Sequence, residues 1–197
     1  MPPIATAPSQ DEQRSFATAA DFEAWLEAEQ HTQRAVWLKI AKKASGTRSV
    51  SYADAIDVAL CFGWIDGQKA PLDDRHWLQR FTPRGARSRW SKINREKAER
   101  LIASGRMRAG GLAEVERAKA DGRWDAAYAG QREATVPDDL QRALDADPAA
   151  AAAFAALDAR NRYAIIWRLN DAKRPDTRSR RLSTFLDMLR RGERLHT

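Results

Sequence analysis

The sequence ALCFGWIDG, at residues 59–67, combines the end of a predicted helix with two turn signals. An apolar helical pattern ends at Gly63, and glycine is the residue that most readily takes the left-handed conformation at a helix end. Asp66 and Gly67 follow, and an Asp-Gly pair is a strong turn signal. The stretch therefore predicts a helix, a reversal at Gly63 and a second turn that brings Trp64 and Asp66 close together.

Upstream of this stretch, the pattern predicts two helices with a strand between them. Thr18 and Asp21 form a capping box, and the helix that they begin runs to about His31. Apolar and polar residues then alternate over residues 36–40, which is the period of a half-buried strand. Ser51 caps the second helix, which leads into the stretch quoted above.

Downstream, residues 76–81 are predicted to form another strand, and Ser91 caps a helix that continues to Ser104. The rest of the chain is mostly helical, with Pro148 at a favourable first helical position. Strands in the first half and helices in the second predict an α+β fold. We expect a small, mostly antiparallel sheet packed with helices in the first two-thirds, and a helical bundle at the C-terminus.

Changes in composition predict three segments. Residues 1–15 lack periodicity and are expected to form a mobile tail. Residues 16–130 are expected to form the α+β domain, with a basic, tryptophan-rich segment. Residues 131–197 are expected to form a helical region that packs on this domain.

The charge of the chain is unevenly distributed. Residues 75–108 contain nine Arg and two Lys against two Glu, a net charge of +9, and residues 173–194 carry a net +5. The whole chain carries +7, so the remainder is acidic, at −7. Two basic blocks of this kind attract anions such as nucleic acid, phosphate metabolites or acidic proteins, unless their arginines lie only on solvated helix faces.

Composition also excludes several classes of site. Cys61 is the only cysteine and there are three histidines, so we expect no metal centre, and no phosphate-loop or dinucleotide motif indicates a cofactor. Residues 1–16 lack the apolar run of a signal peptide, and no stretch approaches the ~18 apolar residues of a membrane span. We therefore expect a cytoplasmic protein that does not insert into membranes.

No set of catalytic residues is evident. Cys61 could act as a nucleophile only with a base such as His76, and its apolar helix end predicts a buried, inert thiol instead. Asp66 could pair with Asp73 or Asp74, but its place before a glycine is explained by the predicted turn. Catalysis is therefore left as an alternative.

A candidate ligand site extends from Trp64 to Asn94. Aromatic rings that alternate with arginines suit a planar anionic ligand, because rings stack and guanidiniums bind phosphate or carboxylate. The expected site residues are Trp64, Asp66, Arg80, Arg84, Ser88, Trp90 and Asn94. If they converge on one concave surface, replacing Arg80 or Arg84 by Ala removes binding at little cost in stability. The alternative is that these side chains only support the fold.

Several unusual stretches occur in order over residues 16–191. They are ALCFGWIDG at 59–67, RFTPR at 80–84, SRWSKIN at 88–94, GRM at 105–107, DGRWD at 121–125 with Ala127-Tyr128, and AKR at 172–174 with Thr177 and Arg178. In order and spacing they resemble the YdeI or OmpD-associated family, also called bacteriocin-protection proteins. The resemblance implies a role in resistance to bacteriocins or cationic antimicrobial peptides and a link to an outer-membrane porin. It implies no catalytic residues.

The sequence thus favours a non-enzymatic cytoplasmic binding protein, related to stress resistance, that engages an anionic small molecule or an acidic protein partner. Its charge of +7 argues against direct capture of a cationic peptide. One alternative is a nucleic-acid-associated protein with weak, sequence-tolerant binding, which steep salt dependence would reveal. The other is an enzyme of unknown reaction that uses Asp66, Cys61 or His76.

Overall fold

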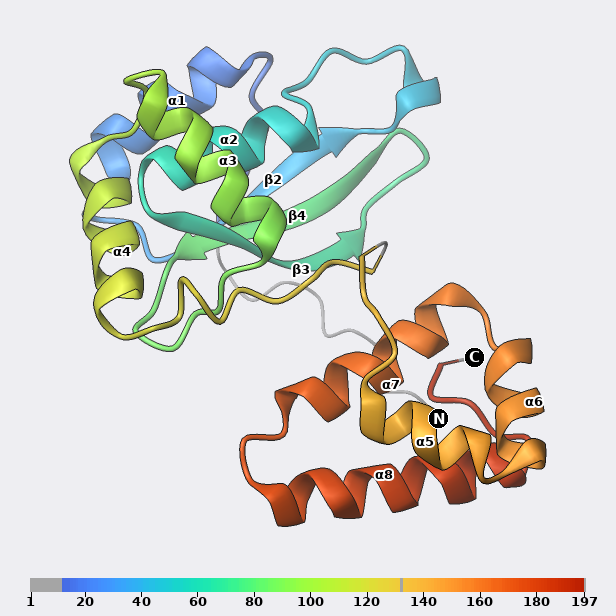
Figure 1. The fold of residues 1–197 in the computed structure, drawn as a ribbon. Coiled ribbons are helices and arrows are strands. Elements are labelled where there is room, and N and C mark those ends of the chain that lie inside the picture. Colours follow the sequence, from blue (N-terminus) through green and yellow to red (C-terminus); the bar gives the residue numbers. More distant parts are fainter. Residues whose placement is uncertain (1–11, 132, 197) are drawn as a thin grey trace. The chain divides into compact units, whose positions relative to one another are not determined.

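The computed structural model describes residues 12–131 and 133–196. The chain divides into two compact units, of which the first ends at Tyr128 and the second begins at Ala129. The N-terminal unit combines a sheet with helices, whereas the described part of the C-terminal unit is helical (Figure 1). The predicted α+β fold is confirmed.

The sheet of the N-terminal unit has four strands in the order β1-β2-β4-β3. The strands are β1 (Gln13–Arg14), β2 (Val36–Ala41), β3 (Trp64–Pro71) and β4 (His76–Pro83). β1 runs parallel to β2 and the other two pairs are antiparallel, so the sheet is mostly antiparallel, as predicted. β1 lies in the stretch expected to be a tail, and residues 1–11 of that stretch lie outside the described residues.

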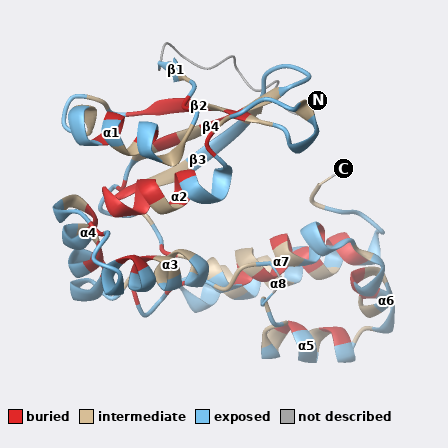
Figure 2. Cartoon of the chain, turned by 90° about the horizontal axis from the view of Figure 1, so that it is seen from above, coloured by how far each residue is buried: buried red, intermediate tan, exposed pale blue. Residues whose placement is uncertain are grey.

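Four α-helices and a short 3-10 helix complete the N-terminal unit. They are α1 (Ala19–Glu29), η1 (Lys43–Ser45), α2 (Tyr52–Cys61), α3 (Lys92–Ala103) and α4 (Ala109–Ala120). The capping box of Thr18 and Asp21 is present, and Ser51 and Ser91 cap α2 and α3 as predicted. Both views place α2 between the sheet and α3, and α2 is the most buried of these helices (Figures 1 and 2).

The predicted turn at Asp66 and Gly67 is wrong, because both residues lie inside β3. The register between β3 and β4 shifts between Asp66 and Lys69, as it does at a β-bulge. The side chain of Gln79, on β4, donates hydrogen bonds to the carbonyl oxygens of Gly67 and Gln68 at 3.0 and 3.1 Å. The buried amide of Gln79 therefore provides hydrogen bonds for the two carbonyl groups at the bulge. The chain continues as a strand instead of turning.

The end of α2 and the start of α4 contact each other through backbone atoms, with glycines in place of side chains. A Cβ atom added at Gly111 would lie 2.4 Å from the carbonyl oxygen of Cys61, and one added at Gly63 would lie 2.7 Å from that of Gly110. Gly63 also has a φ of +75°, which side-chain-bearing residues rarely adopt. The backbone N–H of Arg108 donates to the Cys61 carbonyl at 3.0 Å. The amide end of α4 thus meets the carbonyl end of α2, an arrangement that helix dipoles favour.

The described residues of the C-terminal unit, 129–131 and 133–196, form four helices. They are α5 (Asp138–Asp145), α6 (Pro148–Ala156), α7 (Ala159–Asp171) and α8 (Pro175–Arg190). Asp147 caps α6 with Pro148 at the first helical position, as predicted, and Asp158 caps α7. Apolar side chains from all four helices form one core, which includes Leu140, Phe154, Ile165, Leu169, Phe185 and Leu189.

Arginines of α8 bind the other helices of this unit. Arg178 forms a two-fold hydrogen-bonded ion pair with Asp139 at the start of α5, at 2.6 and 2.7 Å, and donates to the carbonyl of Leu169 near the end of α7. Arg190 binds Asp147, the cap of α6, at 2.6 Å. The hydrogen bonds from Arg178 lower the pKa of Asp139. Part of the basic C-terminal block is therefore structural.

We predict that Gly111→Ala lowers the free energy of unfolding by about 3 kcal/mol, the upper end of what overpacking costs. The added methyl would overlap the carbonyl oxygens of Leu60 and Cys61, at 2.6 and 2.4 Å, and backbone cannot move aside as a side chain can. Urea unfolding followed by tryptophan fluorescence measures the loss, because six of the seven tryptophans lie in residues 1–128. Gly122→Ala is the control: its φ is +77° but its Cβ site is empty, so it costs about 1 kcal/mol. Equal losses for both variants would contradict the close backbone contact.

We predict that acid destabilises the protein partly through Asp139. A carboxyl whose folded pKa is lowered stabilises the fold above its unfolded value, about 3.9, and this stabilisation is lost as pH falls through the folded value. Asp139→Asn should lower the melting temperature at neutral pH and weaken its dependence on pH between about pH 5 and pH 2. Circular dichroism melts measure both effects. Asp176→Asn is the control, because Asp176 is 91% exposed and lies 4.0 Å from Arg174, and it should change neither.

Candidate functional site

The two tryptophans of the predicted site are buried. Trp64 and Trp90 are 2% and 1% exposed. Trp64 meets the ring of Trp25 edge to face at 6.2 Å, and Trp90 meets the ring of Trp124 in the same way at 4.9 Å. Both indoles therefore pack against other side chains of the core and present no open face to a ligand.

Arg84 is also buried, so the expectation that it is a surface arginine was wrong. It is 4% exposed, and its guanidinium lies over the ring of Trp90 at 3.7 Å. Its Nη1 donates to the carbonyl of Arg89 at 3.1 Å. Burial lowers the pKa of Arg84 to about 10, and the nearby carboxylates of Glu114 and Asp66 oppose that shift. The side chain holds the loop that leads into α3.

Asp66 forms a polar cluster that the sequence did not predict. The hydroxyl of Tyr52, at the start of α2, donates to the Asp66 carboxylate at 2.6 Å. Burial raises the pKa of Tyr52, with the hydrogen bond to Asp66 adding to it, and burial also raises the pKa of Tyr128. Both phenols therefore stay protonated at neutral pH and can donate hydrogen bonds, but neither is suited to act as a base. No motif or spacing in the sequence links these two tyrosines to Asp66.

Ser88 and Asn94 are held by local hydrogen bonds. The hydroxyl oxygen of Ser88 accepts a hydrogen bond from the backbone of Gly85 at 3.0 Å. The backbone N–H of Asn94 donates to the cap residue Ser91 at 3.1 Å. Arg123 donates to the carbonyl of Ser88 at 2.7 Å and fixes the loop further. These contacts shape the loop before α3.

Arg80 does not join the other site residues. It pairs with Trp37 across β2 and β4, whereas Asp66 pairs with Phe81 across β3 and β4. Because neighbouring residues of a strand point to opposite faces, Arg80 lies on one face of the sheet and Asp66 on the other. The structure therefore brings Asp66, Arg84 and Trp90 into one neighbourhood and separates Arg80 from it, so the predicted convergence of all seven residues on one surface is wrong. A ligand-binding role for these residues stays a prediction.

Cys61 and His76 lie too far apart to act as a nucleophile and its base. Trp64 pairs with Pro83 at one end of β4, and His76 lies at the other end, roughly 20 Å away at the usual rise per strand residue. Cys61, just before Trp64, is fully buried as predicted, and burial raises the pKa of its thiol. His76 instead faces Asp73 in the β3–β4 hairpin, at 3.2 Å. The expected inertness of Cys61 stays a prediction.

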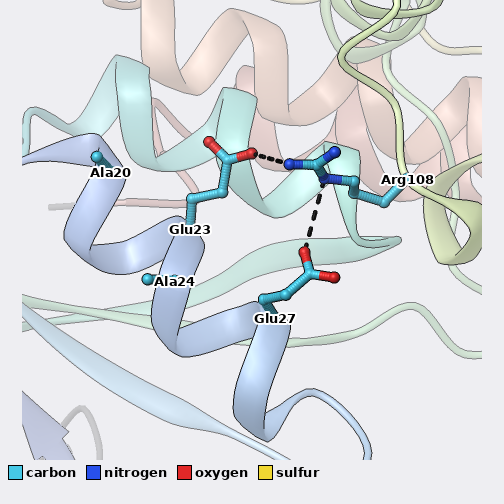
Figure 3. A pocket seen from close by; sticks show the side chains of 5 residues that line it. All are labelled: Ala20, Glu23, Ala24, Glu27 and Arg108. Atoms are coloured by element: carbon cyan, nitrogen blue, oxygen red, sulfur yellow. Dashed lines mark hydrogen bonds and ion pairs between the residues drawn. The ribbon is translucent and has the colours of Figure 1, made fainter.

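A hollow beside α1 has more acidic than basic side chains in its lining. It has a volume of about 380 Å³ and is lined by Ala20, Glu23, Ala24, Glu27 and Arg108. Arg108 lies between the two carboxylates, 2.9 Å from Glu23 and 3.7 Å from Glu27 (Figure 3). Two carboxylates and one guanidinium leave the lining with a net charge of −1, so the hollow does not favour an anion.

A second cleft, between α7 and α8 of the C-terminal unit, keeps an excess of positive charge. It has a volume of about 390 Å³ and is lined by Trp167, Arg168, Asp171, Arg180, Arg181, Thr184 and Phe185. Arg181 donates to the carbonyl of Arg168 and lies 3.3 Å from the Asp171 carboxylate. Three guanidiniums and one carboxylate give the cleft a net charge of +2. The basic block at residues 173–194 predicted positive charge on α8, but no sequence signal indicated that α7 contributes to the cleft.

The described ranges, 12–131 and 133–196, hold no group of three or more His, Cys, Asp or Glu side chains placed to bind a metal. Within the same ranges, none of the helices has the length and hydrophobicity that crossing a bilayer requires.

Two known families match the chain. Residues 14–114 match a family described as Domain of unknown function (DUF8412), and residues 133–192 match one described as Bacteriocin-protection, YdeI or OmpD-Associated (OmdA). The chain belongs to the DUF8412 family and carries an OmdA domain. The predicted resemblance is confirmed. No curated protein and no solved structure matches the chain.

The two matches divide the motifs that carried the resemblance. ALCFGWIDG, RFTPR, SRWSKIN and GRM lie within the DUF8412 match, and AKR with Thr177 and Arg178 lies within the OmdA match. The α7–α8 cleft belongs entirely to the OmdA domain. Trp64, Trp90 and Arg84 lie within the DUF8412 match, whereas DGRWD at 121–125 lies outside both matches.

We predict that Arg84→Ala lowers the free energy of unfolding by about 2 kcal/mol, the value of a desolvated cation–π contact. The variant loses the stacking on Trp90 and the hydrogen bond to the Arg89 carbonyl. Urea unfolding measures the change, with Arg87→Ala as an exposed control that should stay within about 0.5 kcal/mol of the parent. An Arg84 variant as stable as the control would mean that the stacking does not support the fold.

Proposed function

We propose that this protein is a non-enzymatic binding protein that engages an anionic ligand through the α7–α8 cleft of its OmdA domain. The observation that carries the proposal is the net charge of +2 in a concave site of about 390 Å³. Small-molecule sites are typically clefts of this size with a few charged groups among apolar ones.

The pairing of arginines identifies which of them are available to a ligand. Arg178 and Arg190 are bound to carboxylates of α5 and α6, and Arg181 is bound to Asp171 and to a carbonyl of α7. Arg168 donates to the Ala164 carbonyl of its own helix, and neither it nor Arg180 forms an ion pair with any described residue. Both line the cleft. Their charges are therefore available to an anion, which guanidiniums bind through charge-assisted hydrogen bonds.

The residues considered for catalysis favour binding over chemistry. The thiol of Cys61 is buried with a raised pKa, and Asp66 accepts a hydrogen bond from a tyrosine whose pKa is raised. A thiol nucleophile needs a nearby base or a lowered pKa, whereas burial raises the pKa of Cys61. The α7–α8 cleft itself contains arginines and one ion-paired carboxylate.

The description of the OmdA family links the proposal to bacteriocin protection. In this proposal the protein acts in the cytoplasm and contributes to stress resistance indirectly, because a chain at +7 repels a cationic peptide. An association with an outer-membrane porin, which the family resemblance implies, would require an anionic surface on that partner.

We predict that the full chain binds inorganic pyrophosphate and that Arg168→Ala and Arg180→Ala each weaken binding about tenfold or more, equal to about 1.4 kcal/mol. Isothermal titration calorimetry gives the affinity. Arg180 is exposed, so its variant should unfold within about 0.5 kcal/mol of the parent. Arg142→Ala, an exposed charge on α5 outside the cleft, is the matched control and should bind like the parent.

Arg181→Ala separates binding from folding, because Arg181 holds the end of α7. This variant should lose stability, whereas Arg180→Ala should lose only binding. If Arg168→Ala and Arg180→Ala bind pyrophosphate as the parent does, the cleft is not the anion site. If affinity falls steeply with salt and Arg142→Ala weakens binding as the cleft variants do, binding is nonspecific and involves the whole basic surface.

A further inference from the structure

Resting on the proposed function, we propose that the ligand of the α7–α8 cleft is a phosphate monoester joined to a flat heterocycle, the chemical class of a mononucleotide. The cleft combines two kinds of recognition that such a ligand needs. One is a pair of available guanidiniums, Arg168 and Arg180, and the other is the half-buried ring of Trp167, with the buried Phe185 also in the lining.

The charge of the cleft is best matched by a ligand with one phosphate group. Three arginines and Asp171 sum to +2, which matches a phosphate monoester, whose charge at neutral pH is between about −1.5 and −2. A triphosphate would exceed the positive charge and would also bring its oxygens near the Asp171 carboxylate. A carboxylate ligand has two oxygens and needs only one guanidinium, whereas the cleft offers Arg168 from α7 and Arg180 from α8.

The α8 side of the cleft is arranged in two rows along the helix. Arg180 and Thr184 are one turn apart, and so are Arg181 and Phe185, so each pair shares a face of the helix. The hydroxyl of Thr184 donates to the carbonyl of Arg180 at 2.9 Å, which leaves its oxygen as an acceptor at the cleft. The first row therefore offers polar groups, and the second ends in an aromatic ring.

Trp167 supplies a stacking surface on the α7 side. It lines the cleft next to Arg168, is half-buried, and is the only tryptophan in residues 129–197. An indole stacks on a nucleobase with a gain of about 1–3 kcal/mol per base. At about 390 Å³ the cleft has the size of one small ligand rather than of a polynucleotide strand.

The test compares three probes on the full chain by isothermal titration calorimetry: adenosine 5′-monophosphate, ribose 5-phosphate and adenosine. The monophosphate should bind about tenfold or more tightly than either other probe, because it alone engages both the arginines and Trp167. Arg180→Ala should weaken both phosphates and leave adenosine unchanged. Trp167→Leu should lower the affinity for the monophosphate to that for ribose 5-phosphate. Trp167→Phe retains an aromatic ring and should keep most of the affinity for the monophosphate.

A second measurement needs no substitution and so does not depend on the folding of the Trp167 variants. The indole N–H resonance of Trp167 should shift on addition of the monophosphate and stay in place with ribose 5-phosphate. If both phosphates bind equally and depend on Arg180, the heterocycle inference is overturned while the proposed anion site stands. If no phosphate binds, both fail. If a single-stranded oligonucleotide binds more tightly per phosphate than the monophosphate does, the assignment of a mononucleotide ligand is also overturned.

Discussion

The N-terminal unit depends on the backbone contact between the end of α2 and the start of α4. Gly63 ends α2 and leads into β3, and its carbonyl accepts a hydrogen bond at 2.9 Å from Arg84, the residue after β4. On its other side, the backbone of Arg108 binds the carbonyl of Cys61. One small region therefore joins a helix end, two strands and a second helix. The approach requires glycine at positions 63 and 111, because a side chain would separate the carbonyl and amide ends that satisfy each other.

Local signals predicted the elements of the fold but not how they meet. The caps at Thr18, Ser51 and Ser91 each bind a backbone N–H three residues away, so the sequence window that contains the cap also contains its partner. The turn at Asp66 and Gly67 was predicted wrongly because the deciding partner, Gln79, is on another strand. Within a short window, a glycine in a turn and a glycine in a bulge have the same neighbours.

The prediction of the candidate site failed for the same reason, because short sequence windows do not show contacts between distant residues. Arginines beside tryptophans suit a ligand and a core equally, and only the stacking of Arg84 on Trp90 decides between the two. Arg80 could be placed on the other face of the sheet from Asp66 only once the pairing of β4 with β2 and β3 was known. The α7–α8 cleft could not be predicted, because which arginines remain available depends on carboxylates far along the chain, such as Asp139 for Arg178.

The net charge of a chain is a poor guide to what its surface binds, and the C-terminal unit shows why. An ion pair such as Arg178 with Asp139 acts on its surroundings as a dipole, whose field falls off faster than that of a single charge. At physiological salt, charges beyond about 8 Å are largely screened. A ligand in the α7–α8 cleft therefore experiences the +2 of the side chains around it, and neither the +5 of the C-terminal block nor the +7 of the whole chain. Affinity for an anion then depends on the two guanidiniums without an ion pair, Arg168 and Arg180, rather than on the abundance of arginine.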